Sequence, residues 1–252
     1  MDENTVTTIL VSAATAFSTK AVEGPIQTFN DIWNGAFGYK IKYWAKSKEC
    51  LAEQNYKKYI SSIDEKVSKI KEENLQEPQL SIVGPALEAS KYYIEEDKIR
   101  EMFANLISSS MDSTYNGIVQ HSFVEIIKQL SSYDAKLFSS LNLREPYVTL
   151  VYVGNDGAHH YNGYVDKLFI NSNFLDYNAN QISLENLIRL GLIKIEEGAP
   201  LREETLYNRY KFLGNLCSEL NLKYGHNNCI KKYLEITALG KAFKEVCIKD
   251  SL

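Results

Sequence analysis

The sequence predicts a mainly α fold with a small β component: an N-terminal helical bundle followed by a C-terminal module that mixes helices and strands. Apolar residues recur at helical spacing in three consecutive stretches between Glu77 and Phe138, and the residues before them are dense in helix formers. After Pro146, aromatic and β-branched residues alternate, which is typical of strands. A chain of 252 residues is long enough to bury a substantial core.

Residues 1–75 are predicted to form the N-terminal, variable helices. An Ala- and Thr-rich helix is expected over residues 5–22, and a second helix begins at Pro25, a residue suited to a first turn. Helical character returns in IKYWAKSKECLAEQNYKKYISSIDEKVSKIKEEN, residues 41–74. The lysines of this segment indicate a solvated helix face, which we favour over a nucleic-acid patch.

Residues 76–143 are predicted to form a helical core defined by three apolar stripes. The stripes comprise Ala86, Leu87, Ser90, Tyr93 and Ile94; Ile99, Met102, Phe103, Leu106 and Ile107; and Phe123, Ile126, Ile127 and Leu130. Pro85 is expected to begin the first helix. Ser122 with Glu125, and Ser131 with Asp134, have the spacing of a capping box, in which each side chain bonds the other residue's backbone N–H. A loop is expected over residues 111–117.

Residues 144–252 are predicted to form the α+β module. YVTLVYVG and GYVDKLFI indicate two strands, while SLENLIRLGLI indicates a helix that runs into a strand. YLEITALGKAF then reads as strand, turn and helix, and this order resembles a winged helix-turn-helix whose two strands form the wing. Gly191 would end the first of these helices and Thr237 would cap the last. An insertion at about 197–230 lengthens the wing.

The composition favours a cytoplasmic protein. It gives the chain as a whole no positive electrostatic field that would attract nucleic acid. The net charge is −4, and the N-terminus lacks the basic region of a secretory signal. Four cysteines in a chain of this length do not indicate a disulfide framework. The apolar stretch near residue 9 is too short and too polar to span a bilayer, so a membrane partner is not favoured.

The sequence offers no catalytic residue, metal site or cofactor, and it predicts that the protein is not an enzyme. Phosphate-loop, dinucleotide, nucleophile-elbow and HExxH motifs are all missing from the chain. His159 and His160 are neighbours on a predicted strand, so their side chains point to opposite faces. The cysteines and His226 have no zinc-knuckle spacing. The carboxylates of Glu95–Glu101 are better explained by a helix first turn than by a cation.

Four residues of the C-terminal module are the candidates for nucleic-acid contact. Asn186 and Arg189 would point outward from the predicted helix Ser183–Leu190, and Lys231 and Lys232 lie near the wing. One arginine, whose charge is partly offset by that of Glu185, provides few contacts to base edges. A winged helix used for protein contact or dimerisation is therefore favoured over nucleic-acid binding.

Several of these segments together resemble the abortive infection alpha family of bacterial proteins over about residues 75–245. The resemblance is carried by EPQLSIVGPALEASKYYIEEDKIREMFANLISSSMD, by HSFVEIIKQLSSYDAKLF, and by LIRLGLIKI with YLEITALGKAF. It implies a role in phage defence, in which the infected cell stops growing or dies before phage release. It supplies no catalytic residue. Asn105 and His121 are polar positions inside the motif, and we expect them to form helix-to-helix hydrogen bonds in the core.

The sequence therefore predicts a non-enzymatic phage-defence protein that binds a phage component, a host target or another copy of itself. One alternative is a DNA-binding transcriptional regulator that works through Ser183–Leu190. Another is an effector that acts on the membrane through residues 5–22.

Overall fold

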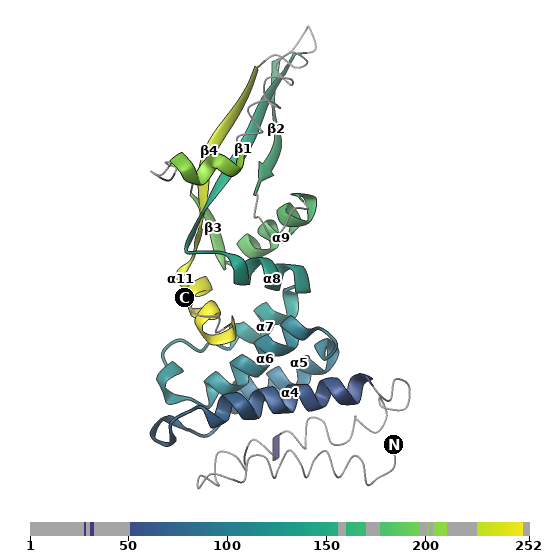
Figure 1. Ribbon diagram of the computed structural model, residues 1–252, viewed down its shortest axis with the longest axis vertical. Helices are drawn as coiled ribbons and strands as arrows, with labels where there is room; N and C mark the ends of the chain where they lie inside the picture. Colours follow the sequence, from purple (N-terminus) through teal and green to yellow (C-terminus); the bar gives the residue numbers. More distant parts are fainter. Residues whose placement is uncertain are drawn as a thin grey trace. The chain divides into compact units, whose positions relative to one another are not determined.

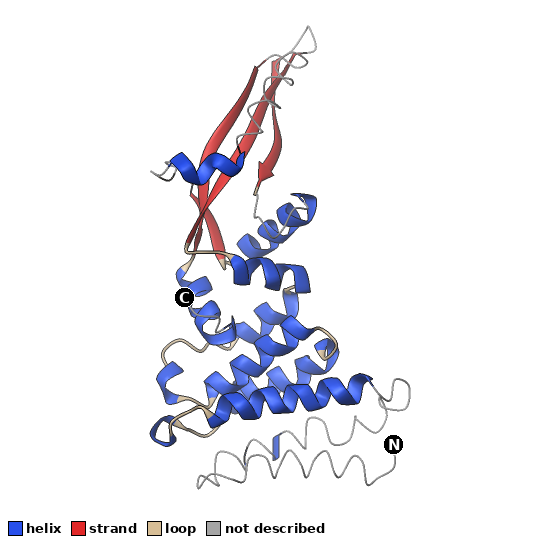
Figure 2. Cartoon of the chain, in the orientation of Figure 1, coloured by secondary structure: helices blue, strands red, loops and turns tan. Residues whose placement is uncertain are grey.

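The computed structural model describes residues 28, 31–32, 51–155, 160–169, 177–196, 201, 204–210 and 226–248. Within these residues the chain is mainly helical and carries one small antiparallel sheet, as the sequence predicted (Figure 2). The helix predicted over residues 5–22 lies outside the described residues.

The chain divides into two compact units, and the second is inserted into the sequence of the first (Figure 1). The first unit comprises the chain up to Ala135 together with the chain from Ala242 onward, and the second comprises Lys136–Lys241. The helices and helical turns of the first unit are α4 (Leu51–Ser68), η1 (Glu72–Asn74), α5 (Leu80–Ser90), η2 (Lys91–Tyr93), α6 (Asp97–Ser110), η3 (Ser113–Tyr115), α7 (Ser122–Gln129) and η5 (Lys244–Ile248). Helices α8 (Ser132–Ser140) and α11 (Ala238–Phe243) span the two boundaries.

Helix α6 is the centre of the first unit, where it contacts α4, α5, α7 and η5. The predicted stripe along this helix is buried, but so are the positions between its members, because every residue from Met102 to Ser110 is buried. The sequence thus predicted one buried face, whereas the helix is buried on all sides from Met102 onward and is exposed only in its first turn, at Asp97 and Lys98. Small side chains explain the difference: Ala104 and the serines at 108–110 let neighbouring elements approach α6 closely.

Helix α5 begins earlier than Pro85, so that prediction was wrong. The helix starts at Leu80 and contains Pro85 in its interior. An interior proline costs about 3 kcal/mol, whereas burying an aliphatic side chain contributes about 1.5–3 kcal/mol. Ile82 and Val83 both lie on the additional turn and are only 1% and 0% exposed, so their burial outweighs the cost. Gly84 also removes the Cβ that would crowd the following proline ring.

One of the two predicted capping boxes is confirmed and the other is wrong. The Ser131 backbone N–H donates to Asp134 Oδ2 at 2.8 Å, and the Asp134 N–H donates to Ser131 Oγ at 3.0 Å. Ser122 instead lies inside helix α7, because His121 already has helical backbone angles of φ −57° and ψ −34°. An N-cap residue requires an extended backbone, which the Ser122 position therefore lacks. Glu125 bonds Lys128 Nζ at 2.9 Å instead of closing a box.

The second unit is built on a four-stranded antiparallel sheet of order β2-β1-β4-β3. Its elements are β1 (Arg144–Asn155), β2 (His160–Leu168), α9 (Tyr177–Arg189), β3 (Ile193–Glu196), η4 (Glu204–Tyr210) and β4 (His226–Ile236). The two strands predicted after Pro146 pair as β1 and β2, and the predicted helix-to-strand segment forms α9 and β3. Helix α9 begins at Tyr177, before the predicted start at Ser183.

The two halves of the C-terminal motif meet where α9 ends and α11 begins. Gly191 has φ 73°, the left-handed conformation that ends a helix, as predicted. Thr237 Oγ1 donates to Gly191 O at 2.6 Å and accepts the Gly240 N–H at 2.9 Å, so Thr237 caps α11, as predicted. A Cβ added to Gly240 would lie 2.0 Å from Leu192 O. Only glycine therefore permits this close approach.

The described part of the insertion packs on the sheet. Tyr207 and Tyr210 of η4 form an apolar cluster with Val148 of β1. The Tyr210 hydroxyl donates to Pro146 O at 2.9 Å, and the Tyr207 hydroxyl donates to Lys232 O at 2.6 Å. The two tyrosines thus attach η4 to both central strands.

The substitution Gly240→Ala tests the junction. Alanine is the better helix former by about 1 kcal/mol, yet the clash with Leu192 O should lower the free energy of unfolding by about 1–3 kcal/mol. Urea unfolding measures the change. Gly117→Ala is the control: a Cβ at this position meets nothing within 4 Å, and we expect a change within about 0.5 kcal/mol. Equal stability of the two variants would contradict the close approach.

Candidate functional site

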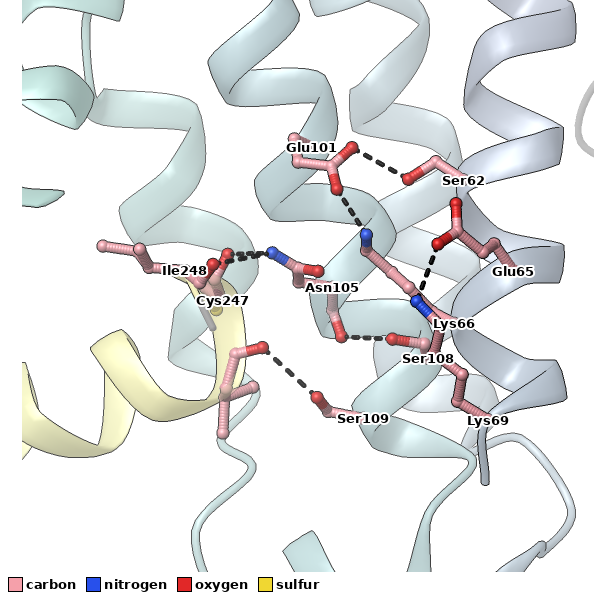
Figure 3. Close-up of polar contacts among 11 residues, drawn as sticks. Ser62, Glu65, Lys66, Lys69, Glu101, Asn105, Ser108, Ser109, Cys247 and Ile248 are labelled. Carbon is pink, nitrogen blue, oxygen red and sulfur yellow. Dashed lines mark hydrogen bonds and ion pairs between the residues drawn. The ribbon is translucent and has the colours of Figure 1, made fainter. Parts of the chain in front are cut away.

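The described residues contain no group of three or more His, Cys, Asp or Glu side chains that could hold a metal ion. No helix in the described part of the chain is long and apolar enough to cross a membrane. The candidate site must therefore be built from other polar contacts. The motif helix α6 carries the most extensive set (Figure 3).

Asn105 and Ser109 of α6 bind the backbone of the C-terminal turn η5 (Figure 3). Asn105 Nδ2 donates to Cys247 O at 2.8 Å and to Ile248 O at 3.2 Å, and Ser109 Oγ donates to Val246 O at 3.2 Å. The last carbonyls of a helix have no partner within that helix. Side chains of α6 supply the missing donors, so Asn105 is buried in the core as predicted, but its acceptors lie in the C-terminal turn.

Apolar packing accompanies these hydrogen bonds. Phe243, Val246 and Cys247 are each 0% exposed. The Phe243 ring packs edge-on against Phe123 of α7, with ring centroids 5.3 Å apart and an interplanar angle of 90°. The C-terminal turn is thus bound to the first unit through both its side chains and its carbonyls.

The N-terminal half of α6 is tied to α4 by an ion pair. Glu101 accepts a hydrogen bond from Ser62 Oγ at 2.8 Å and forms an ion pair with Lys66 (Figure 3). The neighbouring carboxylates of the acidic run have separate partners: Asp97 pairs with Arg100, and Glu96 accepts from Ser132 Oγ at 2.7 Å. Asp97 also begins α6, which confirms that this run opens a helix.

His121 occupies a different environment from the predicted one. Its Nε2 lies 2.8 Å from Ser81 Oγ, so it joins the start of α7 to the first turn of α5. Both residues are exposed. The expected helix-to-helix contact therefore exists, but its placement in the core was wrong, because both helix starts reach the surface.

The four candidate nucleic-acid residues each contact a neighbour within the second unit. Arg189 donates to Asn186 Oδ1 from Nη2 at 2.7 Å and from Nε at 3.2 Å, and its side chain is exposed on α9. Lys231 Nζ lies 5.5 Å from the centroid of the Tyr207 ring. Lys232 contributes its backbone carbonyl to Tyr207. These contacts lie within α9 and between η4 and the sheet.

Sequence reasoning missed a row of charges across the sheet. Glu235 of β4 lies between Arg144 of β1 and Lys194 of β3, with N–O distances of 3.1 Å and 3.2 Å. Hydrogen bonds from Lys194 and then Arg144 hold the pKa of the Glu235 carboxyl below its usual value. The register of the strands brings these residues together. The sequence alone does not reveal this row of charges, because the strand pairing must be known first.

Comparison with protein families identified a matching family. The model of the family described as abortive infection alpha matches residues 51–247. Asn105 and its acceptor at Cys247 both fall within the matched residues. Comparison with curated proteins found no match, and comparison with solved structures also found none.

The packing of α4 generates a prediction about alkaline pH. Burial raises the pKa of Tyr56 to about 12 from an ordinary value of 10.0. The unfolded chain thus loses this proton at lower pH than the folded chain. The stabilising contribution is complete below about pH 10 and is lost as the pH rises through about 12.

Tyr56→Phe should therefore flatten the fall of the unfolding free energy between about pH 10 and 12. Denaturant titration at a series of pH values measures that fall. Tyr92→Phe is the control, because Tyr92 is 79% exposed. Identical pH profiles for wild type and Tyr56→Phe would contradict the burial of this hydroxyl.

Proposed function

The chain belongs to the abortive infection alpha family, and on that premise we propose that it acts in phage defence by binding, without catalysing a reaction. The partner is a phage component, a host protein or a second copy of the chain. The protein acts in the cytoplasm.

The observation that carries this proposal is the burial of the motif helix. Met102 to Leu106 are all buried, and the polar member of this run, Asn105, binds the chain's own backbone. Residues used in this way build a scaffold, which supports a role in binding over one in catalysis. Recognition of a partner then falls to the exposed surfaces that the scaffold supports.

The outer face of α9 is the surface that best suits a protein partner. Ile182 is 71% exposed, and exposed Glu185 and Arg189 follow it at helical spacing. An exposed apolar side chain beside charges of both signs suits a protein partner better than a phosphate backbone, which is bound mainly through positive charge.

The strand order supports a winged-helix reading of the second unit. Helix α9 is followed by β3 and β4, which pair antiparallel, and β1 lies on the other side of β4. This is the helix and wing order expected from the sequence. We propose that this winged helix serves protein contact.

Phage challenge of cells that express the chain tests the proposal. We expect fewer plaques and loss of infected cells, and we expect Ile182→Glu to restore plaque formation while the unfolding free energy stays within about 0.5 kcal/mol of wild type. Leu80→Glu is the matched control, because Leu80 is a 62% exposed apolar residue of the first unit. Unchanged plaquing by the wild type across a broad phage panel would contradict a role in defence.

A DNA-binding regulator is the second candidate, because the same helix and wing order occurs in DNA readers. It predicts sequence-selective gel shifts that weaken with salt and are lost in Arg189→Ala. Lys98→Ala, which removes an exposed cation from the first unit, is the control. Binding that is equal for all three proteins, or absent at low salt, would eliminate this candidate.

A further inference from the structure

We propose that Phe243 together with η5 forms a releasable latch that restrains the first unit until a partner binds. In the docked state the latch is helical and packs against α6 and α7. In the released state it no longer contacts them. Its role as a restraint rests on the proposed function in phage defence, whereas its docking does not.

The latch depends on docking for its helical structure. Helix α11 has 6 residues and η5 has 5, whereas isolated helices need roughly 12–15 residues to form in water. The π-helical geometry of η5 is also rare, because π-helices occur mostly as single turns within α-helices, frequently at functional sites. The segment is therefore expected to lose its helix when it leaves α6.

The hydrogen bonds favour an all-or-none transition. Asn105 and Ser109 bind three consecutive backbone carbonyls, those of Val246, Cys247 and Ile248. These carbonyls point toward α6 together only while the turn is helical. Unwinding would therefore break all three bonds at once, which is the behaviour of a two-state element.

Release would uncover a specific surface on the first unit. The Phe123 ring would lose its edge-on partner Phe243, and the buried side chains of Val246, Cys247 and Ile248 would leave the core. The amide of Asn105 would become available to another acceptor. The uncovered surface would thus suit an apolar helical segment with exposed end carbonyls, the same chemistry as the latch.

The position of the latch in the chain provides a way to control it. Lys241, the last residue of the second unit, is two residues before Phe243. A partner that binds the second unit and alters α11 would act on the latch directly through the backbone. A protein that halts growth on infection requires a silent state, and the docked latch would supply it.

Amide hydrogen exchange of the full chain tests the latch without reference to defence. We expect Asn105→Ala to accelerate exchange at residues 244–248 by about tenfold, the effect of losing roughly 1.4 kcal/mol of hydrogen bonding. Exchange in α5 and α7 should stay unchanged. Ser108→Ala is the control, because Ser108 Oγ is buried but donates to Asn105 O of its own helix.

Ser109→Ala removes a single hydrogen bond to the latch, so it should also accelerate exchange at 244–248, but by less. This variant replaces Asn105→Ala in the test if Asn105→Ala does not fold. Acceleration of 244–248 together with α5 and α7 would overturn the proposal, because the segment would then unfold only with the whole unit. Exchange at 244–248 that is unchanged in both variants would also overturn it.

Growth of uninfected cells tests the restraint. At equal protein level, Asn105→Ala should slow growth without phage, whereas wild type and Ser108→Ala should not. A purely structural role predicts reduced protein and normal growth. Selective opening with normal growth would overturn the restraint, and the wild-type plaque count separately decides whether the chain acts in defence.

Discussion

The burial of α6 on all sides from Met102 to Ser110 is the constraint on which the first unit depends. A helical stretch without a solvent face must satisfy its polar groups inside the protein. Ser108 and Ser110 do so within the helix, by donating to carbonyls three residues earlier at 2.9 Å and 2.7 Å. Asn105 and Ser109 instead donate to carbonyls of η5, so this turn completes the core of the first unit.

The insertion of one unit into the other brings these contacts about. The chain leaves the first unit, forms the sheet unit, and returns to cover α6. The sheet unit is closed by a separate set of contacts. Thr237 donates a hydrogen bond to the residue that ends α9, and Gly240 permits the close approach of the Leu192 carbonyl. The contacts that close the sheet unit lie before Lys241, and the contacts that bind η5 to α6 lie after it. Helix α11 therefore begins at the first set of contacts and ends at the second.

Most features set by neighbours in sequence could be predicted, the Ser122 capping box excepted, and features set by distant residues could not. The Thr237 cap, the left-handed Gly191 and the Ser131 box follow from local backbone chemistry and were predicted. The start of α5 was not, because the burial of Ile82 and Val83 outweighed the preference of proline for a first turn. The acceptors of Asn105 lie 142 and 143 residues away in the chain, so no local pattern identifies them.

The same reasoning separates the residues that mark the family from those that meet a partner. The run from Met102 to Leu106 makes the resemblance recognisable, yet it is buried and binds only the protein itself. Such a pattern specifies a scaffold, and one scaffold can carry different functions on its surface. We therefore propose that selectivity for a trigger resides in exposed positions such as Ile182, or in surfaces uncovered when a buried element moves. In this protein the element that we propose to move is held by the motif residue Asn105, so a residue that marks the family can control function from a buried position.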